Sequence, residues 1–172
     1  IRRVMSEPRR NDHEDKQTRN INYTSYTYNV SNTNRKTSSG SLVDRGANGG
    51  LAGYDTRVIA KSDKTVDVTG IDHHELTHLP IVTAGAVVNT QRGDAIVIMN
   101  QYARILDGPT IHSCIQLEAF KNDVNDKSSI ISDSKQSIVT NDGFIIPIDF
   151  MNGLPYIQMR PYTDDEWNRL PH

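Results

Sequence analysis

Two apolar runs joined by a short polar turn constrain the fold of this chain more than any other feature. Residues 79–90 read LPIVTAGAVVNT and residues 94–105 read DAIVIMNQYARI, and both runs are rich in β-branched side chains. The connecting residues, QRGD, form a good hairpin connection. The pattern therefore predicts two strands joined as a β-hairpin.

Shorter strand signals surround this hairpin. The apolar stretch SLVD at 41–44 runs into a glycine-rich loop, which predicts a short strand that ends there. Residues 57–72 alternate between apolar and polar side chains, with a turn expected at 61–64. Residues 137–150 predict further short strands around the tight turn NDG at 141–143.

Helical signals are few. The stretch SCIQLEAFKND at 113–123 mixes apolar residues with good helix formers, and Ser113 is placed to cap the helix. Near the end of the chain, Thr163 is followed three residues later by Glu166, which predicts a capping box and a short helix. The sum is a mainly β domain with one or two short helices.

The apolar residues are concentrated in one part of the chain. Only 35% of residues are hydrophobic, yet the repeated Val, Ile and Leu runs all fall within 41–160. Residues 1–20 mix both charges without a period, which is typical of a disordered tail. Because the chain begins at Ile1 and stops at NRLPH, we expect a segment of a longer polypeptide.

Charge and cysteine content limit the partners and the compartment. A formal net charge of -2 gives no whole-chain attraction to nucleic acid or membranes, and we expect neither as a partner. No apolar run approaches the roughly 18 residues of a membrane span. The single cysteine, Cys114, has no partner for an internal disulfide, which favours a reducing, intracellular compartment.

The sequence HHELTH contains His74-Glu75-x-x-His78, the pattern of zinc peptidases. That chemistry needs a helix, so that two imidazoles one turn apart face one metal ion. Here Pro80 follows two residues after His78, and an apolar strand run continues from there. We expect a strand or loop with solvated histidines, no bound metal and no cofactor, and we keep the zinc peptidase as the weaker alternative.

Two other kinds of site find little support. The sequence GANGG lacks the lysine and hydroxyl residues of a phosphate-binding loop. His112 and Cys114 are only two positions apart, a spacing that does not indicate a catalytic pair. We therefore interpret Cys114 as a buried thiol.

The stretch Leu42-Val43-Asp44-x-Gly46-Ala47 has the layout of an aspartic peptidase loop. Such an enzyme presents an aspartate at the end of an apolar strand, where two carboxylates share one proton and act as base and acid. A small residue after the aspartate lets the loop backbone approach its partner. A plain turn is the alternative interpretation of this pattern.

Several stretches together resemble the Gag-Pol polyproteins of Copia-type LTR retrotransposons, in particular those of algal, diatom-like genomes. The resemblance covers roughly residues 20–172 and rests on GSLVDRGANGGLAGYDTRVI, VDVTGID, QRGDAIVIMNQYA, TIHSCIQLE, KNDVNDKS, NDGFIIPID, NGLPY and RPYTDDEW. It implies a retropepsin-like aspartic protease domain at 21–122, an acid-protease half-barrel with one short helix. Residues 123–172 would be a smaller β-rich spacer that leads toward an integrase and ends in a short helix.

The resemblance implies roles for the loop residues. Asp44 matches the catalytic aspartate, Gly46 and Ala47 match its Gly-Ala pair, and strands within 57–102 match the flap region and the body of the protease. The function implied is an endopeptidase that processes its own polyprotein inside the cell, in the cytoplasm or within a virus-like particle. Its substrate would be a peptide segment of that polyprotein.

Arg45 departs from the family pattern, which has serine or threonine at this position. That hydroxyl normally joins a network between two loops, and an arginine beside two carboxylates favours their ionised form. Arg45 therefore motivates an alternative, a catalytically inactive scaffold or dimerisation module. Because the apolar-apolar-Asp-x-Gly pattern occurs once, the active form would be a homodimer with two copies of Asp44 at its twofold axis.

Overall fold

The computed structural model describes residues 40–70 and 74–172. The predicted charged tail at 1–20 lies outside these residues. Within the described residues, the two helices span six residues each, and none is long and apolar enough to cross a membrane.

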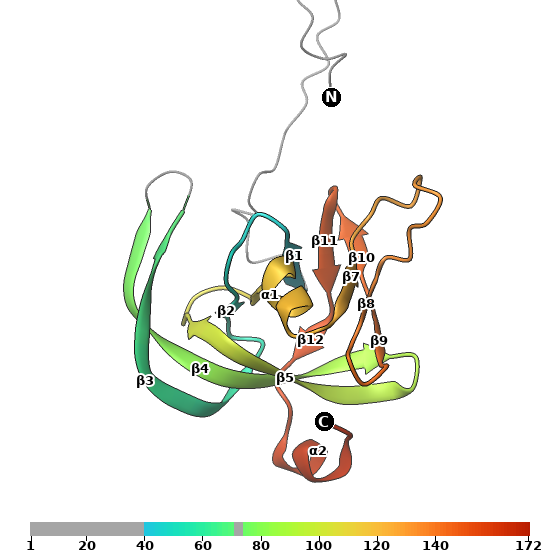
Figure 1. Cartoon of the computed structure of the whole chain (residues 1–172). Coiled ribbons are helices and arrows are strands. Elements are labelled where there is room, and N and C mark those ends of the chain that lie inside the picture. The colour runs from blue at the N-terminus through green and yellow to red at the C-terminus, as the bar shows by residue number, and fades with distance from the viewer. Residues whose placement is uncertain (1–39, 71–73) are drawn as a thin grey trace, which may run out of the picture. The chain divides into compact units, whose positions relative to one another are not determined.

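The described residues form a mainly β structure, as predicted (Figure 1). The larger sheet has the order β10-β11-β1-β6-β2-β5-β4-β12, with β3 paired to β4 outside this path, and the smaller sheet has the order β7-β8-β9. The strands are β1 Ser41–Asp44, β2 Leu51–Ala52, β3 Arg57–Thr69, β4 Glu75–Thr90, β5 Gly93–Arg104, β6 Ile111–Ser113, β7 Asp123–Asn125, β8 Ser137–Val139, β9 Ile145–Pro147, β10 Asp149–Met151, β11 Leu154–Ile157 and β12 Met159–Arg160. The two helices are α1 Cys114–Ala119 and α2 Asp164–Arg169.

The larger sheet is open. Its path begins at β10 and ends at β12, and these two strands do not pair with each other in the described part of the chain. The closure expected of a half-barrel is therefore not formed. Residues after 122 contribute to this same sheet, because β11 pairs with β1 and β12 pairs with β4. The division of the chain into two domains at residue 122 stays a prediction.

The central hairpin of β4 and β5 is confirmed. The two strands pair antiparallel up to the closing pair of Thr90 and Gly93, and Gly93 has a φ of +96°. Glycine tolerates this left-handed conformation, which a side chain would strain. The Thr90 hydroxyl donates a hydrogen bond of 2.7 Å to the Gly93 carbonyl and fastens the turn.

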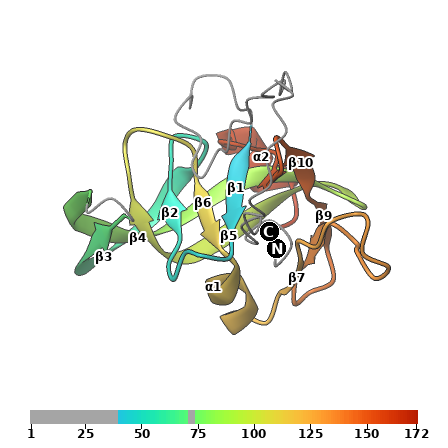
Figure 2. The same cartoon turned by 90° about the horizontal axis from the view of Figure 1, so that it is seen from above.

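The prediction of a turn at 61–64 is wrong. Strand β3 continues through these residues, and its pairing with β4 jumps from Lys61 to Thr65, so the polar stretch forms a β-bulge within one long strand. Residues 59–70 and 74–78, called the arm below, are exposed except for the half-buried Val68. In Figures 1 and 2 the outer ends of β3 and β4 stand apart from the other described strands.

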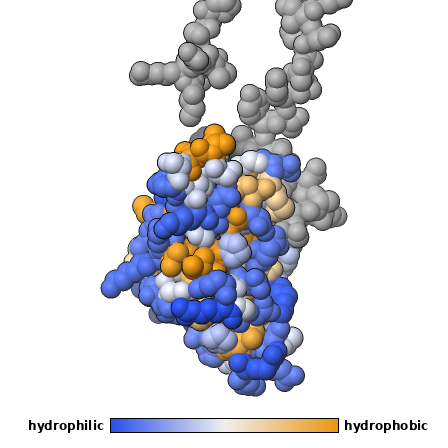
Figure 3. All heavy atoms as spheres, turned by 90° about the vertical axis from the view of Figure 1, so that its right-hand side faces the viewer, coloured by the Kyte–Doolittle hydropathy of each residue, from blue (hydrophilic) through white to orange (hydrophobic). Residues whose placement is uncertain are grey.

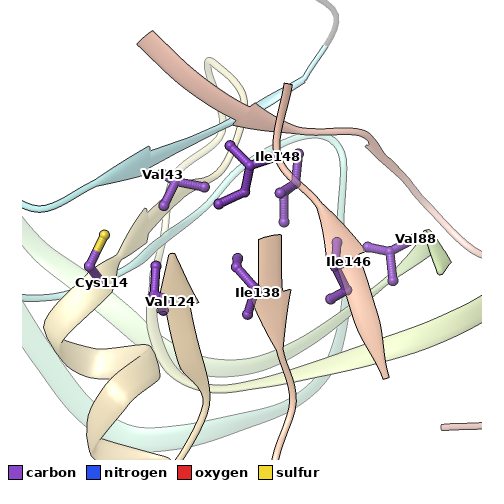
Figure 4. Close-up of a cluster of buried hydrophobic side chains, with 8 residues drawn as sticks. Val43, Val88, Cys114, Val124, Ile138, Ile146 and Ile148 are labelled. Carbon is purple, nitrogen blue, oxygen red and sulfur yellow. The ribbon is translucent and has the colours of Figure 1, made fainter. Parts of the chain in front are cut away.

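The two sheets pack against each other through one apolar cluster (Figure 4). Branched side chains from the small sheet meet residues of β1, β4, β11 and the start of α1; the buried members are Val43, Val88, Cys114, Val124, Ile138, Ile146, Ile148 and Ile157. Burying one such aliphatic side chain contributes about 1.5–3 kcal/mol, so this cluster holds the small sheet in place. The face in Figure 3 is mostly hydrophilic, and its hydrophobic atoms form small separate patches.

Candidate active site

Asp44 is the last residue of β1, a strand in the interior of the larger sheet. Strand β1 pairs antiparallel with β11 on one side and parallel with β6 on the other, where Asp44 lies opposite Ser113. Figure 2 shows β1 and β6 side by side, both ending beside α1. The apolar residues of SLVD supply the strand, and Val43, 2% exposed, anchors it in the core. The sequence therefore places one half-buried carboxylate at a strand end, as predicted.

The Asp44 carboxylate is held by its own loop. Its Oδ1 atom accepts a hydrogen bond of 2.7 Å from the backbone N–H of Gly46. A Cβ atom at position 46 would lie 3.2 Å from the same oxygen, tighter than an ordinary contact. Glycine at this position therefore leaves room for the carboxylate to bind the loop backbone.

Ser113 and Gln116 fasten the rest of the loop to α1 and β5. The Ser113 hydroxyl donates a 2.7 Å hydrogen bond to the Ala47 carbonyl and accepts one of 3.2 Å from the N–H of Gln116, which confirms Ser113 as the N-cap of α1. The Gln116 side chain accepts a 2.6 Å hydrogen bond from the N–H of Gly50. Its amide nitrogen donates to the carbonyls of Asn100 and Gln101 at 3.0 and 3.1 Å.

Gly50 allows the loop to lie directly on an aromatic ring. A Cβ atom built at this position would fall well inside contact distance of the Tyr102 ring. Tyr102 is 2% exposed and fixed in the core, so the ring cannot easily move aside. The close approach of backbone and ring requires glycine here.

Arg45 binds two acidic residues of its own chain, and neither of them is Asp44. Its guanidinium forms ion pairs with Glu118 of α1 at 3.0 Å and with Asp126 at 2.9 Å, and it also donates to the Val124 carbonyl at 3.3 Å. The hydrogen bond to Asp126 raises the pKa of Arg45 further above its usual range. Within the described residues, no ion pair joins Arg45 to Asp44.

Asp55 is a site-supporting residue that sequence reasoning missed. It is 6% exposed and accepts hydrogen bonds from the Ser41 hydroxyl at 2.6 Å and from the N–H and hydroxyl of Thr110 at 3.0 and 2.6 Å. These bonds join the start of β1 to the start of β6, which brings the strand ends beside Asp44 into register. An isolated aspartate in the polar sequence GYDT carries no local signal of this role.

Cys114 is a buried free thiol, as predicted. Burial, followed by the charge of Asp126, raises the pKa of this thiol to about 11, which keeps it protonated at neutral pH. His112 is also buried, and its ring contacts Tyr102 rather than Cys114. The two residues do not form a nucleophilic pair.

The His74-Glu75-x-x-His78 pattern lies at the start of a strand. Residues from Glu75 onward belong to β4, and His78 has a φ of 56°, so the helix on which the zinc-peptidase alternative depends is not formed. In residues 40–70 and 74–172, no group of three or more His, Cys, Asp or Glu side chains is placed to hold a metal ion.

Comparison of the chain with protein-family models, with curated proteins and with solved structures found no match. The observations that bear on function are therefore the geometry around Asp44 and the sequence pattern of its loop.

Proposed function

We propose that this chain is an aspartic endopeptidase domain of the retropepsin type, which hydrolyses peptide bonds of a retrotransposon polyprotein as a homodimer. The observation that carries the proposal is the placement of Asp44. A partly exposed carboxylate stands at the end of an apolar strand and accepts a hydrogen bond from the glycine two residues later. Its surrounding loop is fastened by Ser113 and Gln116.

In this mechanism, two Asp44 carboxylates from two chains share one proton. One of them takes a proton from a water molecule as the water attacks the scissile carbonyl, and the other protonates the carbonyl oxygen. The single-chain structure contributes one carboxylate, and the second has to come from an identical subunit. The exposed arm of β3 and β4 would close over the bound peptide as a flap.

The contacts of Arg45 affect whether two Asp44 carboxylates can share a proton. A free guanidinium beside two carboxylates would keep both ionised and remove the shared proton. Because Arg45 already forms ion pairs with Glu118 and Asp126, its positive charge is largely compensated within the subunit. This arrangement supports an active peptidase despite the departure from the usual serine or threonine.

The inactive scaffold is the second candidate, and one observation favours it. Position 45 offers no hydroxyl to join the two loops of a dimer, and Arg45 is turned toward its own subunit. If the scaffold interpretation is correct, Arg45→Ser or Arg45→Thr would create cleavage that the wild type lacks.

The test of the peptidase is cleavage of a Gag-Pol polyprotein fragment by the wild-type chain and by Asp44→Asn. We expect cleavage by the wild type with an acid-shifted pH optimum and pepstatin sensitivity, and a loss of at least about 1,000-fold in Asp44→Asn. Asp165→Asn, which alters an exposed aspartate in α2, is the matched control and should cleave like the wild type. Equal cleavage by wild type and Asp44→Asn would end the proposal.

A further inference from the structure

Strand β5 has one edge that is only partly paired. On this side β2 pairs with Ala103 and Arg104, and residues 94–100 have no strand neighbour in the described part of the chain. The other edge of β5 pairs with β4 from Gly93 to Ala103. An unpaired edge presents a row of backbone N–H and C=O groups that can pair with another extended chain.

One hydrogen bond shows where these backbone groups point. The N–H of Ile96 donates to the Pro171 carbonyl at 2.8 Å, so the backbone groups of Ile96 point away from β4. In an antiparallel pair, successive residues point their backbone groups alternately toward the partner strand and away from it. The register with β4 is regular from Gly93 to Met99, so the N–H and C=O of Ile98 also point to the free edge.

The free edge is occupied on both sides of Ile98. On one side, Pro171 takes the N–H of Ile96. On the other side, the Gln116 amide donates to the Asn100 carbonyl at 3.0 Å. Within the described residues, no hydrogen bond reaches the backbone of Ile98 from this edge. One residue of an added strand, placed opposite Ile98, would satisfy both of its groups.

A pocket of about 260 Å³ adjoins this edge. Residues 95–100 of β5 line it, and so do Pro171 and Gln116, which bind the edge on either side of Ile98. Because the partners on both sides belong to the pocket wall, the free groups of Ile98 between them open into the same space. The Ile98 side chain is 39% exposed and is not covered by the core.

The pocket has apolar sides and a polar end. Leu117 and Phe120 from α1 and Phe144 before β9 contribute to the apolar sides, and the polar end consists of Thr140, Asn141, Asp142 and His172. The Arg92 guanidinium lies over the Phe144 ring, 5.0 Å from its centroid, on the neighbouring surface. One carboxylate with a cation nearby leaves little net charge, and the apolar sides disfavour a charged occupant.

We propose that this edge of β5 binds an extended, uncharged peptide segment of another protein, which adds one short strand opposite Ile98. Main-chain hydrogen bonds give affinity in this mode of binding, and pockets for alternate side chains give specificity. Four steps along β5 separate Ile96 from Asn100, about 14 Å, so about three peptide residues fit between Pro171 and Gln116. The site does not involve Asp44 and is independent of the peptidase proposal.

The test adds the blocked peptide Ac-Thr-Val-Thr-Val-Thr-NH2 to the full chain, with two N-methylated versions as controls. One version is methylated at both valine nitrogens and the other at the first two threonine nitrogens. Only alternate residues of an added strand face β5, so one version should bind at least tenfold more weakly than the unmodified peptide and the other should bind like it. Equal binding of the two versions, or no saturable binding of the unmodified peptide, would overturn the proposal.

The backbone amide of Ile98 reports where the peptide binds. We expect its hydrogen exchange, measured by NMR, to slow at least fivefold when the unmodified peptide is bound. An unchanged Ile98 amide at saturating peptide would place the peptide elsewhere and refute the site. Protection that rises with protein concentration in the absence of peptide would mean that a second copy of this chain covers the edge, and this result would also overturn the proposal.

A variant pair in α1 tests the pocket wall. Phe120→Ala removes a side chain that is 42% exposed and lines the pocket, and it should weaken binding of the unmodified peptide at least threefold. Ile115→Ala shortens a side chain that is 61% exposed and does not line the pocket, and it should bind like the wild type. Equal peptide binding by the two variants would contradict the proposed seat of the peptide beside α1.

Discussion

The loop after β1 and the arm of β3 and β4 are held in opposite ways. The loop is fastened by side chains that come from β6, α1 and the residues after β7, so that Ala47, Gly50 and Arg45 each have a partner more than 60 positions away. The arm is held mainly by the backbone pairing of β3 with β4, which shifts register three times, and by one hydrogen bond of 2.7 Å from the N–H of His78 to Asp67; its side chains are exposed apart from the half-buried Val68. Regions with few buried contacts open at low cost.

The difference matches two requirements of the proposed peptidase. A catalytic carboxylate must keep its position within a fraction of an ångström, and long-range contacts provide that constraint around Asp44. A segment that admits and covers a peptide must move, and the arm has the exposure and irregular pairing that allow it.

The pH dependence of stability between pH 6.5 and 4 should arise at His112 of β6, whose ring contacts Tyr102 beneath the loop. Burial holds its pKa near 4 in the folded chain, against 6.5 for an ordinary histidine. As pH falls from about 6.5 toward 4, the unfolded chain binds a proton that the folded chain does not, so stability is lost in this window. The loss should be about 3 kcal/mol.

Urea unfolding at pH 7 and pH 4 measures this loss, and two variants assign it. His112→Phe should remove most of the histidine contribution. His78→Gln, in the exposed arm, should keep it. A pH dependence that is the same in wild type and His112→Phe would contradict the buried, neutral imidazole.

Two adjacent glycines test how tightly the loop packs. Gly50→Ala drives a methyl group into the Tyr102 ring and should lower the free energy of unfolding by about 2 kcal/mol. Gly49→Ala is the matched control, because a Cβ at that position meets no atom within 4 Å, and it should cost little or slightly stabilise. Thermal unfolding of the pair gives the comparison, and equal melting temperatures would show that the loop does not rest on Tyr102.

The ion pairs of Arg45 should contribute a smaller amount. Its side chain is 51% exposed, so screening by water limits the loss in Arg45→Ser to about 1 kcal/mol, and salt should reduce it further. Arg45→Lys keeps the charge but loses the planar donor group and should fall between wild type and Arg45→Ser. Chemical unfolding at low and high salt measures both variants. A loss of stability that salt does not reduce would contradict the ion-pair account.

Shortening a side chain in the arm should have the smallest effect on the free energy of unfolding. Val66 is 37% exposed, and Val66→Ala should change the free energy of unfolding by less than about 0.5 kcal/mol. The same truncation at Val43, which is 2% exposed behind Asp44, should cost roughly 2 kcal/mol. Similar losses at both positions in urea unfolding would mean that the arm is as firmly packed as the core.

Features encoded by neighbouring residues were predictable from the sequence. The strand at 41–44, the hairpin closed by Gly93, the Ser113 cap and the capping box of Thr163 and Glu166 all appear in the structure. In each case the residues that decide the conformation lie within a few positions of one another. The position of Asp44 at a strand end likewise follows from neighbouring residues, since the apolar stretch SLVD is followed by a glycine-rich loop.

Features that depend on distant residues were not predictable. The parallel pairing of β1 with β6, the hydrogen bonds from Thr110 to Asp55 and the acidic partners of Arg45 join residues 55 to 81 positions apart. The polar sequence at 61–64 suggested a turn, yet pairing with β4 carries the strand through it. Pairing with β4 overrides the local turn propensity at these residues. A single sequence does not show which strands pair, so this pairing could not be predicted.

If catalysis needs Asp44 from two chains at once, mixing wild type with Asp44→Asn at constant total concentration should lower the activity more than in proportion to the wild-type fraction. If random dimers form and only the wild-type dimer cleaves, an equal mixture should retain about one quarter of the wild-type activity. Retention of about one half would mean that each chain acts alone, which would contradict the shared dyad.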